Sequence, residues 1–309
     1  MLPDNRRTIR GSTMSALPST ELRPVPVRVA LVVGGDSPIE TRLRDILVHD
    51  AWAIQRVPDN AIALAVAQKK NFDLILTSEK TSGKEDIELL RKIRKVRPHI
   101  RLIILADEST PRDVIDSMRE HAFSYFSTPI ALDDLEAMIR HAIEEPCWDD
   151  GIEVVSATPE WIRLRARCAI KTADRVLQFI DEIAELPNPQ RHAIGTAMRE
   201  MLINAIEHGG RLDPNQYVEI SYVRARHMVK CRISDPGEGF TLDEIPHAAV
   251  ANPADDPVRH LEYRDALGMR PGGFGVLLAQ KLVDQVIYNE QGNEVQLIKY
   301  LALEPQPAE

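Results

Sequence analysis

Five short apolar runs, each followed by an amphipathic segment, dominate the first half of this chain and restrict its fold more than any other feature. The apolar runs are Val27–Val33, Ala53–Val57, Leu74–Thr77, Leu102–Ala106 and Ser124–Phe126. The segments that follow them, predicted as helices, are Ile39–Val48, Ala61–Lys69, Asp86–Val96, Pro111–His121 and Leu132–Ile143. This alternation is typical of a parallel sheet with helices on both faces. We therefore predict a doubly wound α/β domain with a five-strand parallel sheet.

The second half of the chain has a different order of elements. We expect a strand at Ile152–Ser156, a long helix from Pro159, a second long helix over Pro189–His208, strands at Tyr217–Arg224 and Met228–Asp235, a helix over Gly275–Val286, and closing strands at Val286–Asn289 and Glu294–Leu303. Strands grouped beside helices in this way predict an α+β two-layer sandwich. A chain of 309 residues is also long enough for two hydrophobic cores.

The border between the two halves is set by composition. A proline, a glycine and four acidic residues fall within residues 144–151, which is typical of an exposed connection. We therefore expect a flexible leader over residues 1–26, a first domain over 27–145, a linker over 146–151, a second domain over 152–305 and a short tail over 306–309.

Charge and hydropathy exclude several classes of function. The 38 basic and 47 acidic residues give a net charge of −9, so phosphate backbones would repel the chain and nucleic acid is not expected as a partner. The apolar runs are far shorter than the ~20 residues of a membrane span, and the leader lacks the apolar stretch of a secretory signal. Cys147, Cys168 and Cys231 lie far apart and in no metal-ligand spacing, so we expect a reduced, cytoplasmic protein.

The first domain resembles the receiver domain of two-component response regulators, over roughly residues 27–145. The register follows from Asp73–Leu76 in the middle strand and from Ile87–Arg91 in the next helix. A working receiver needs carboxylates to hold a divalent metal, an aspartate to accept a phosphoryl group, and a hydroxyl and a lysine to bind the product.

This sequence departs from the receiver pattern at each of those positions. Gly34 and Gly35 replace the acidic pair, with Asp36 beside them, while the acceptor, hydroxyl and lysine positions fall on Ser78, Ala106 and Thr128, the last before a retained Pro129. Too few carboxylates remain to bind Mg²⁺, and a serine cannot form an acyl phosphate. The resemblance therefore implies a pseudo-receiver, a docking or dimerising module whose fourth and fifth helices form its contact surface.

The first of three motifs in the second domain lies on its second long helix. Glu200, Asn204 and His208 are spaced by four and so project from one helical face beside an apolar stripe. An amide oxygen such as that of Asn204 can complete a Mg²⁺ shell built mostly by phosphates and water, and Glu200 can act as a base. An ordinary amphipathic helix would give the same pattern.

The other two motifs are rich in glycine. Asp235 leaves a strand into Gly237 and Gly239, where a carboxylate can meet a purine amino group. Residues Arg270–Gly275 open directly into an amphipathic run, so that backbone amides there can face phosphate oxygens. The Asp235 motif, taken alone, is also compatible with a simple turn, and the motif at Arg270–Gly275, taken alone, does not specify a phosphate site.

Together and in this order, the motifs resemble the GHKL ATP-binding fold shared by gyrase, the ninety-kilodalton heat-shock chaperone, histidine kinases and DNA mismatch proteins, over about residues 152–303. The resemblance implies that Asn204 binds Mg²⁺, that Asp235 binds the adenine amino group, and that residues 241–272 form a lid. It places the further ATP contacts at His208, Gly237, Gly239, Arg270, Gly273, Phe274 and Gly275. His208 has the capping of its helix end as an alternative role, and Arg270 has an exposed lid position.

We expect no dimerising hairpin with a substrate histidine ahead of the ATP-binding region, because residues 151–189 leave space for only one strand and one long helix. This compact form most resembles the anti-sigma-factor serine/threonine kinases of partner switching, which use ATP to phosphorylate an anti-anti-sigma (STAS-like) protein. The resemblance implies a protein kinase with Glu200 as the catalytic base, ATP and Mg²⁺ as cofactors, and a sigma factor as a further partner.

Two alternatives stay open at this stage. A nucleotide-binding switch would use ATP only to set the lid and the affinity for a partner, whereas a pure adaptor would have lost both sites. Glu200 opposes the first alternative, and Asn204 with Asp235 opposes the second. The sequence does not identify the substrate protein or the input signal, and it is compatible with a monomer and with a homodimer.

Overall fold

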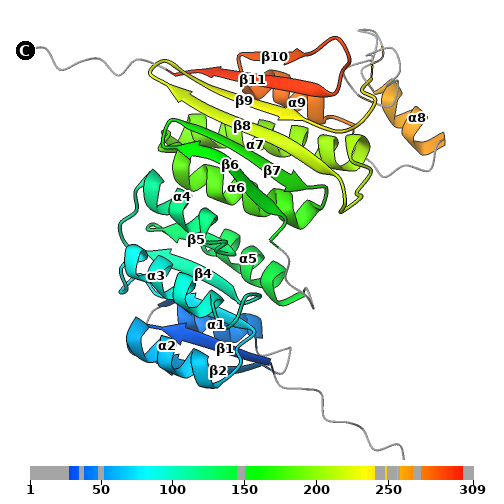
Figure 1. Ribbon diagram of the computed structural model, residues 1–309. Helices are drawn as coiled ribbons and strands as arrows, with labels where there is room; N and C mark the ends of the chain where they lie inside the picture. The colour runs from blue at the N-terminus through cyan, green and yellow to red at the C-terminus, as the bar shows by residue number, and fades with distance from the viewer. Residues whose placement is uncertain are drawn as a thin grey trace, which may run out of the picture.

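The computed structural model describes residues 28–34, 38–47, 52–144, 150–240, 248, 256, 258–266 and 273–301. The chain forms two sheets, each with its own helices, which lie one above the other in Figure 1. The predicted leader and tail, Asp36, Cys147 with most of the linker, and Arg270 with most of the lid lie outside the described residues.

The first sheet is parallel and has the strand order β2-β1-β3-β4-β5. Its strands are β1 (Arg28–Val33), β2 (Trp52–Val57), β3 (Leu74–Thr77), β4 (Arg101–Ala106) and β5 (Ser124–Ser127). Its helices are α1 (Pro38–Leu47), α2 (Asn60–Lys69), α3 (Gly83–Arg94), α4 (Pro111–Arg119) and α5 (Leu132–Glu144). The predicted five-strand doubly wound α/β fold is confirmed.

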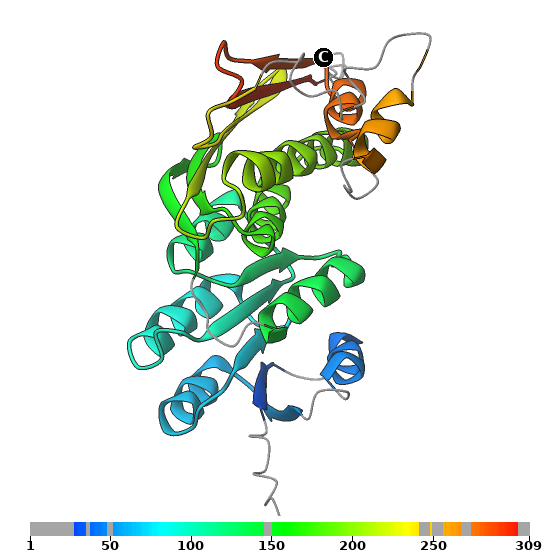
Figure 2. The same ribbon diagram turned by 90° about the vertical axis from the view of Figure 1, so that its right-hand side faces the viewer.

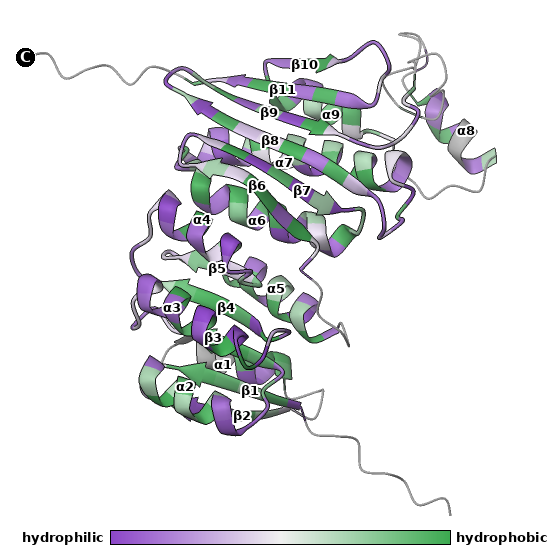
Figure 3. Ribbon diagram, in the orientation of Figure 1, coloured by the Kyte–Doolittle hydropathy of each residue, from purple (hydrophilic) through white to green (hydrophobic). Residues whose placement is uncertain are grey.

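Successive side chains of β1 pack on opposite faces of this sheet. Ala30 and Val32 belong to the apolar cluster that contains α1 and α5, whereas Leu31 and Val33 belong to the cluster that contains α2, α3 and α4. Because helices cover both faces, the side chains of the central strands must be apolar, or must have hydrogen-bond partners if they are polar. The strands β1 and β4 are accordingly green along most of their length in Figure 3.

The second sheet is antiparallel and has the strand order β10-β11-β9-β8-β7-β6. Its strands are β6 (Ile152–Thr158), β7 (Trp161–Arg167), β8 (Tyr217–Ala225), β9 (Met228–Ser234), β10 (Gln285–Tyr288) and β11 (Glu294–Tyr300). The helices α6 (Ile170–Ala184), α7 (Asn188–Asn204) and α9 (Gly275–Leu282) cover one of its faces (Figure 2). A π-helical turn (Ala205–Gly209) extends α7, and α8 (Arg259–Ala266) lies within the predicted lid. The predicted α+β two-layer sandwich is confirmed.

The expectation of one strand and one long helix between residues 151 and 189 is wrong, because a second strand comes first. In β7, Ile162, Leu164 and Ala166 are buried while the residues between them are at least partly exposed. The arginines between them, Arg163 and Arg165, have a high helix propensity. They therefore conceal the alternation of buried and exposed residues that marks a strand with one buried face. The helix α6 consequently begins at Ile170 rather than near Pro159.

The predicted helix over Gly275–Val286 is also too long. α9 ends at Leu282, and Gln285–Tyr288 form β10, which pairs with β11. None of the helices in the described ranges has the length and apolar character that crossing a bilayer requires. Cys168 and Cys231 are both buried and free.

We expect Leu164→Ala to lower the free energy of unfolding by about 2–5 kcal/mol, because it opens a cavity in the core under the second sheet. Arg163→Ala removes a neighbouring side chain that forms a half-exposed ion pair with Glu219, so it should cost at most about 1 kcal/mol. Urea unfolding of both variants measures the difference, and equal costs would contradict the inward and outward alternation of β7.

Candidate functional site

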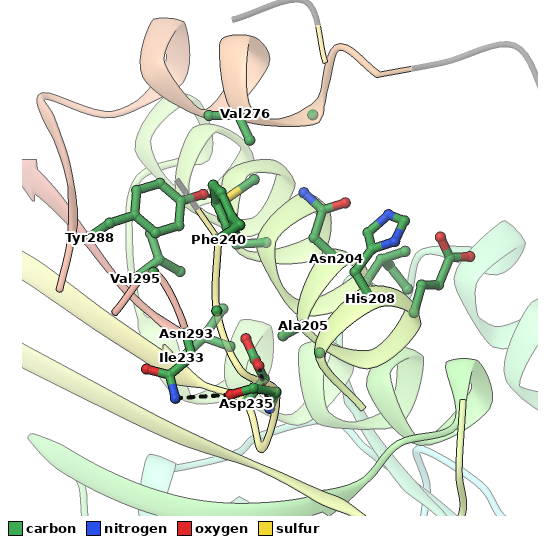
Figure 4. A pocket seen from close by; sticks show the side chains of 18 of the residues that line it. Asn204, Ala205, His208, Ile233, Asp235, Phe240, Val276, Tyr288, Asn293 and Val295 are labelled. Atoms are coloured by element: carbon green, nitrogen blue, oxygen red, sulfur yellow. Dashed lines mark hydrogen bonds between the residues drawn. The ribbon is translucent and has the colours of Figure 1, made fainter. Parts of the chain in front are cut away.

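A cavity of about 700 Å³ lies between α7 and the strands β9, β10 and β11 of the second sheet (Figure 4). One wall comes from α7 and its π-helical extension, which contribute Glu200, Asn204 and His208. The opposite wall includes Asp235 at the end of β9, followed by Gly237 and Gly239. Gly273 and Gly275 complete the rim at the start of α9.

Asp235 is held in place by the backbone around it. Its N–H donates to the Asn293 carbonyl oxygen at 2.9 Å, and its Oδ1 accepts from the Gly237 N–H at 2.9 Å. Burial raises the pKa of Asp235, and the hydrogen bond from Gly237 partly offsets that effect. A carboxylate has more acceptor sites than one N–H can fill, so Asp235 can accept a further hydrogen bond from a molecule in the cavity.

Two glycines make room for this carboxylate. A Cβ at Gly209 would lie 2.1 Å from Asp235 Oδ1, and a Cβ at Gly237 would lie 2.8 Å from the same oxygen. The end of the π-helical turn and the loop after β9 therefore approach each other only because neither position carries a side chain. Because of this close approach, Asn204 and Asp235 line the same cavity from opposite walls.

The start of α9 closes against α7 in the same manner. A Cβ at Gly275 would lie 2.7 Å from Glu200 Oε2 and 3.5 Å from Asn204 Nδ2. Gly273 has φ +90°, a backbone conformation that favours glycine. The first residue of α9 thus lies close to Glu200 and Asn204. The free amides at the start of a helix can bind the oxygens of a phosphate chain.

Phe274 is not among the described residues that line the cavity. Phe274 is 44% exposed and lies against His260 of α8, with the ring centroids 4.5 Å apart and nearly perpendicular. Arg270 lies outside the described residues. The predicted ATP contacts of both stay predictions.

An aromatic pair in the cavity was missed by the sequence analysis. Phe240 and Tyr288 meet edge to face with centroids 5.2 Å apart, and the Tyr288 hydroxyl donates to Met201 Sδ at 3.3 Å (Figure 4). Burial raises the pKa of Tyr288 to about 12, so its hydroxyl stays neutral. The pair provides an apolar wall against which a flat ring can lie. Phe240 follows directly on the glycine motif, which is the signal that could have identified it.

The donor set of the cavity fits a cation that arrives with its own ligands. No group of three or more His, Cys, Asp or Glu side chains in the described part of the chain could hold a metal ion. Asn204 offers one neutral oxygen, so a Mg²⁺ ion there would take its remaining ligands from phosphates and water. The residues present therefore fit a magnesium nucleotide better than a permanently bound metal.

Ser78, the predicted acceptor position of the first domain, is closed to solvent. The Ser78 side chain is 1% exposed, and a Cβ at Gly34 would lie 1.9 Å from its Oγ. The nearby buried Asp86 accepts hydrogen bonds from Asn60 Nδ2 at 2.7 Å and Thr81 Oγ1 at 2.8 Å. Burial raises the pKa of Asp86 to about 6. Its carboxylate is thus engaged inside the protein instead of facing solvent.

Two family models match the chain. Residues 30–140 match the response regulator receiver domain, and residues 163–299 match the histidine kinase-like ATPase domain. The chain therefore contains a receiver domain followed by a histidine kinase-like ATPase domain. The predicted combination of these two folds is confirmed.

Known relatives resemble the two halves separately. The second half is similar to the serine-protein kinase RsbW of Oceanobacillus iheyensis, 27% identical over 157 residues, covering 50% of this chain and 89% of that protein. The first half is similar to the DNA-binding transcriptional regulator NtrC of a Bradyrhizobium strain, 24% identical over 122 residues, covering 40% of this chain. That match spans 25% of the length of NtrC.

Solved structures similar to part of the chain include receiver domains. One from Methanospirillum hungatei is 24% identical with a TM-score of 0.33, covering 37% of this chain and 91% of that structure. Another, from Clostridium thermocellum, is 26% identical with a TM-score of 0.33, covering 38% of this chain and 94% of that structure.

We expect Gly209→Ala to lower the melting temperature by about 4 °C or more, because the new methyl group must displace the Asp235 carboxylate. Gly195→Ala is the matched control, since a Cβ there meets no heavy atom within 4 Å. That control should be neutral or stabilising by up to about 1 kcal/mol, as for other glycines replaced within helices. Calorimetry compares the two variants, and equal melting temperatures would refute the close approach at Asp235.

Proposed function

We propose that this protein is an ATP-dependent serine/threonine protein kinase of the anti-sigma-factor type, which phosphorylates an anti-anti-sigma (STAS-like) protein in a partner-switching pathway. The observation that carries this proposal is that Glu200, Asn204 and Asp235 line one cavity of a domain similar to the serine-protein kinase RsbW. The same resemblance supports a sigma factor as a further partner, and the widely spaced cysteines support a cytoplasmic location.

Nucleotide binding would use the two ends of the cavity differently. Asp235, fixed by Gly237 and Asn293, would accept a hydrogen bond from the adenine amino group, while Phe240 and Tyr288 pack against the ring. At the other end, Asn204 and the first amides of α9 would face the phosphates. When bound, Mg²⁺ would neutralise charge on the transferring phosphoryl group.

Phosphoryl transfer would place Glu200 beside the attacking hydroxyl. The serine oxygen of the substrate forms a bond to the γ-phosphorus as the bond to the ADP oxygen breaks, and Glu200 takes the hydroxyl proton. Glu200 suits this role because it lies one helical turn from Asn204 on the cavity side of α7, against the start of α9.

The receiver domain would act in this protein without phosphorylation. Ser78 is buried under Gly34, and Asp86 is engaged by Asn60 and Thr81. These contacts support a regulatory or docking module that neither binds Mg²⁺ nor accepts a phosphoryl group.

We expect Asp235→Asn and Asn204→Ala each to weaken Mg-ATP binding at least tenfold, measured by isothermal titration calorimetry.

Glu200→Ala should keep the affinity within about threefold but lower transfer of radiolabelled phosphate to a purified STAS-like protein by about 100-fold or more, the range of general base catalysis. Glu160→Ala, in the exposed turn between β6 and β7, is the control for both assays. Binding without transfer in the wild type would favour the nucleotide switch, and no binding would refute the proposal.

We further expect no label on the chain after incubation with radiolabelled acetyl phosphate and Mg²⁺, because the acceptor position is a buried serine. An authentic receiver domain, treated in parallel, confirms that the phosphodonor is active. A label that Ser78→Ala removes would overturn the assignment of a pseudo-receiver.

A further inference from the structure

The helix α6 is shared between the two domains. Its apolar side chains, Val176, Phe179, Ile180 and Ile183, belong to the core that also contains buried residues of α7. Its polar side chains Arg175, Gln178 and Glu182 recur at helical spacing and contact β5 and the segment before it. α6 therefore lies between the edge of the receiver sheet and the helix that carries the nucleotide site (Figure 1).

Arg175 fastens α6 to the receiver domain. Its side chain is 3% exposed; its Nε donates to the Phe123 carbonyl oxygen at 2.8 Å, and Nη2 donates to that of Ala122 at 3.1 Å. Nη2 also forms an ion pair with Asp150 at 2.6 Å. Burial disfavours the ionised form of Asp150, but the Arg175 charge and hydrogen bonds from His121 and Arg175 hold its pKa below the usual value. Since the partners of this buried charge lie in the receiver domain and in the linker, Arg175 fixes the position of α6 against the receiver domain.

Glu182 contacts the end of β5. Its Oε2 accepts from the Ser127 N–H at 3.1 Å and from Ser127 Oγ at 2.5 Å, while Gln178 Nε2 donates to the Tyr125 carbonyl oxygen at 3.3 Å. Ser127 also lines a second cavity of about 780 Å³, at the carboxyl ends of β3, β4 and β5. Ser127 thus contacts both this second cavity and α6, so a structural change at the cavity would be transmitted to α6 through Ser127.

The contact of α6 with α7 leads to the proposed kinase site. Asp174 of α6 pairs with Arg199, the residue directly before Glu200, and its Oδ2 lies 3.7 Å from His141 Nε2 of α5. The pair with Arg199 is half exposed on the arginine side, so on its own it contributes little. The packed apolar layer between α6 and α7 is the stronger connection.

We propose that Arg175 and Glu182 are positioning residues for the nucleotide site, because through them the edge of the receiver sheet fixes α6, and α6 fixes the part of α7 that carries Glu200 and Asn204. The face of α4, β5 and α5, expected as a surface for docking or dimerisation, contacts α6 of the same chain. The inference rests on the proposed function only for the identity of the ligand.

Hydrogen exchange of the full chain without nucleotide tests this directly. Ser127→Ala and Glu182→Ala should each speed exchange of the amides of residues 199–204 about fivefold, while amides of β8 stay within twofold. In the double variant, exchange of the same amides should also be about fivefold faster than in the wild type. The effects should not add, because both changes disrupt the same contact between positions 127 and 182. Thr77→Val is the control, because it removes a buried hydroxyl bonded to the Leu105 N–H in the same sheet without touching α6.

Calorimetric titration of the same variants with Mg-ATP provides the second readout. Ser127→Ala should weaken binding about fivefold although Ser127 lies in the other domain, and Thr77→Val should not. Faster exchange confined to residues 124–128 and 178–182, or an effect of Thr77→Val equal to that of Ser127→Ala, would overturn the inference. If the wild type fails to bind Mg-ATP, the proposed function fails, and the exchange pattern still decides whether the receiver domain positions α7.

Discussion

The packing of α7 is the constraint on which the rest of the structure depends. Its buried residues, among them Met198, Met201 and Leu202, fill the layer between the second sheet and α6. That burial fixes the rotation of the helix and leaves Glu200 and Asn204 on the side of the cavity. Glycines at 209 and 275 then allow neighbouring backbone to approach without a side chain between. The polar site is thus a consequence of an apolar packing layer.

Sequence periodicity predicted the elements whose burial is simple. Strands covered on both faces are nearly continuous apolar runs, and the site motifs of α7 and β9 lie where their helical and strand patterns predict. β7 was missed because Arg163 and Arg165 occupy its exposed face. The meeting of Phe240 with Tyr288, and the contacts of Arg175 with β5, depend on pairings between distant segments that no local pattern specifies.

The two domains are joined by more than their connecting segment. If the edge of its sheet fixes α6, the receiver domain has a structural role in this chain that does not depend on phosphorylation. The hydrogen bonds from Arg175 to the carbonyl oxygens of Phe123 and Ala122, and the contact of Glu182 with Ser127, provide that link. This view gives a structural role to the complete five-strand sheet in which Ser78 is buried.

The most direct test of the central claim is a crystal structure of the protein with Mg²⁺ and a non-hydrolysable ATP analogue. The account predicts the adenine amino group within hydrogen-bonding distance of the Asp235 carboxylate and the cation bound to the Asn204 side-chain oxygen. A nucleotide bound outside this cavity, or bound within it with its phosphates toward Asp235, would contradict the account.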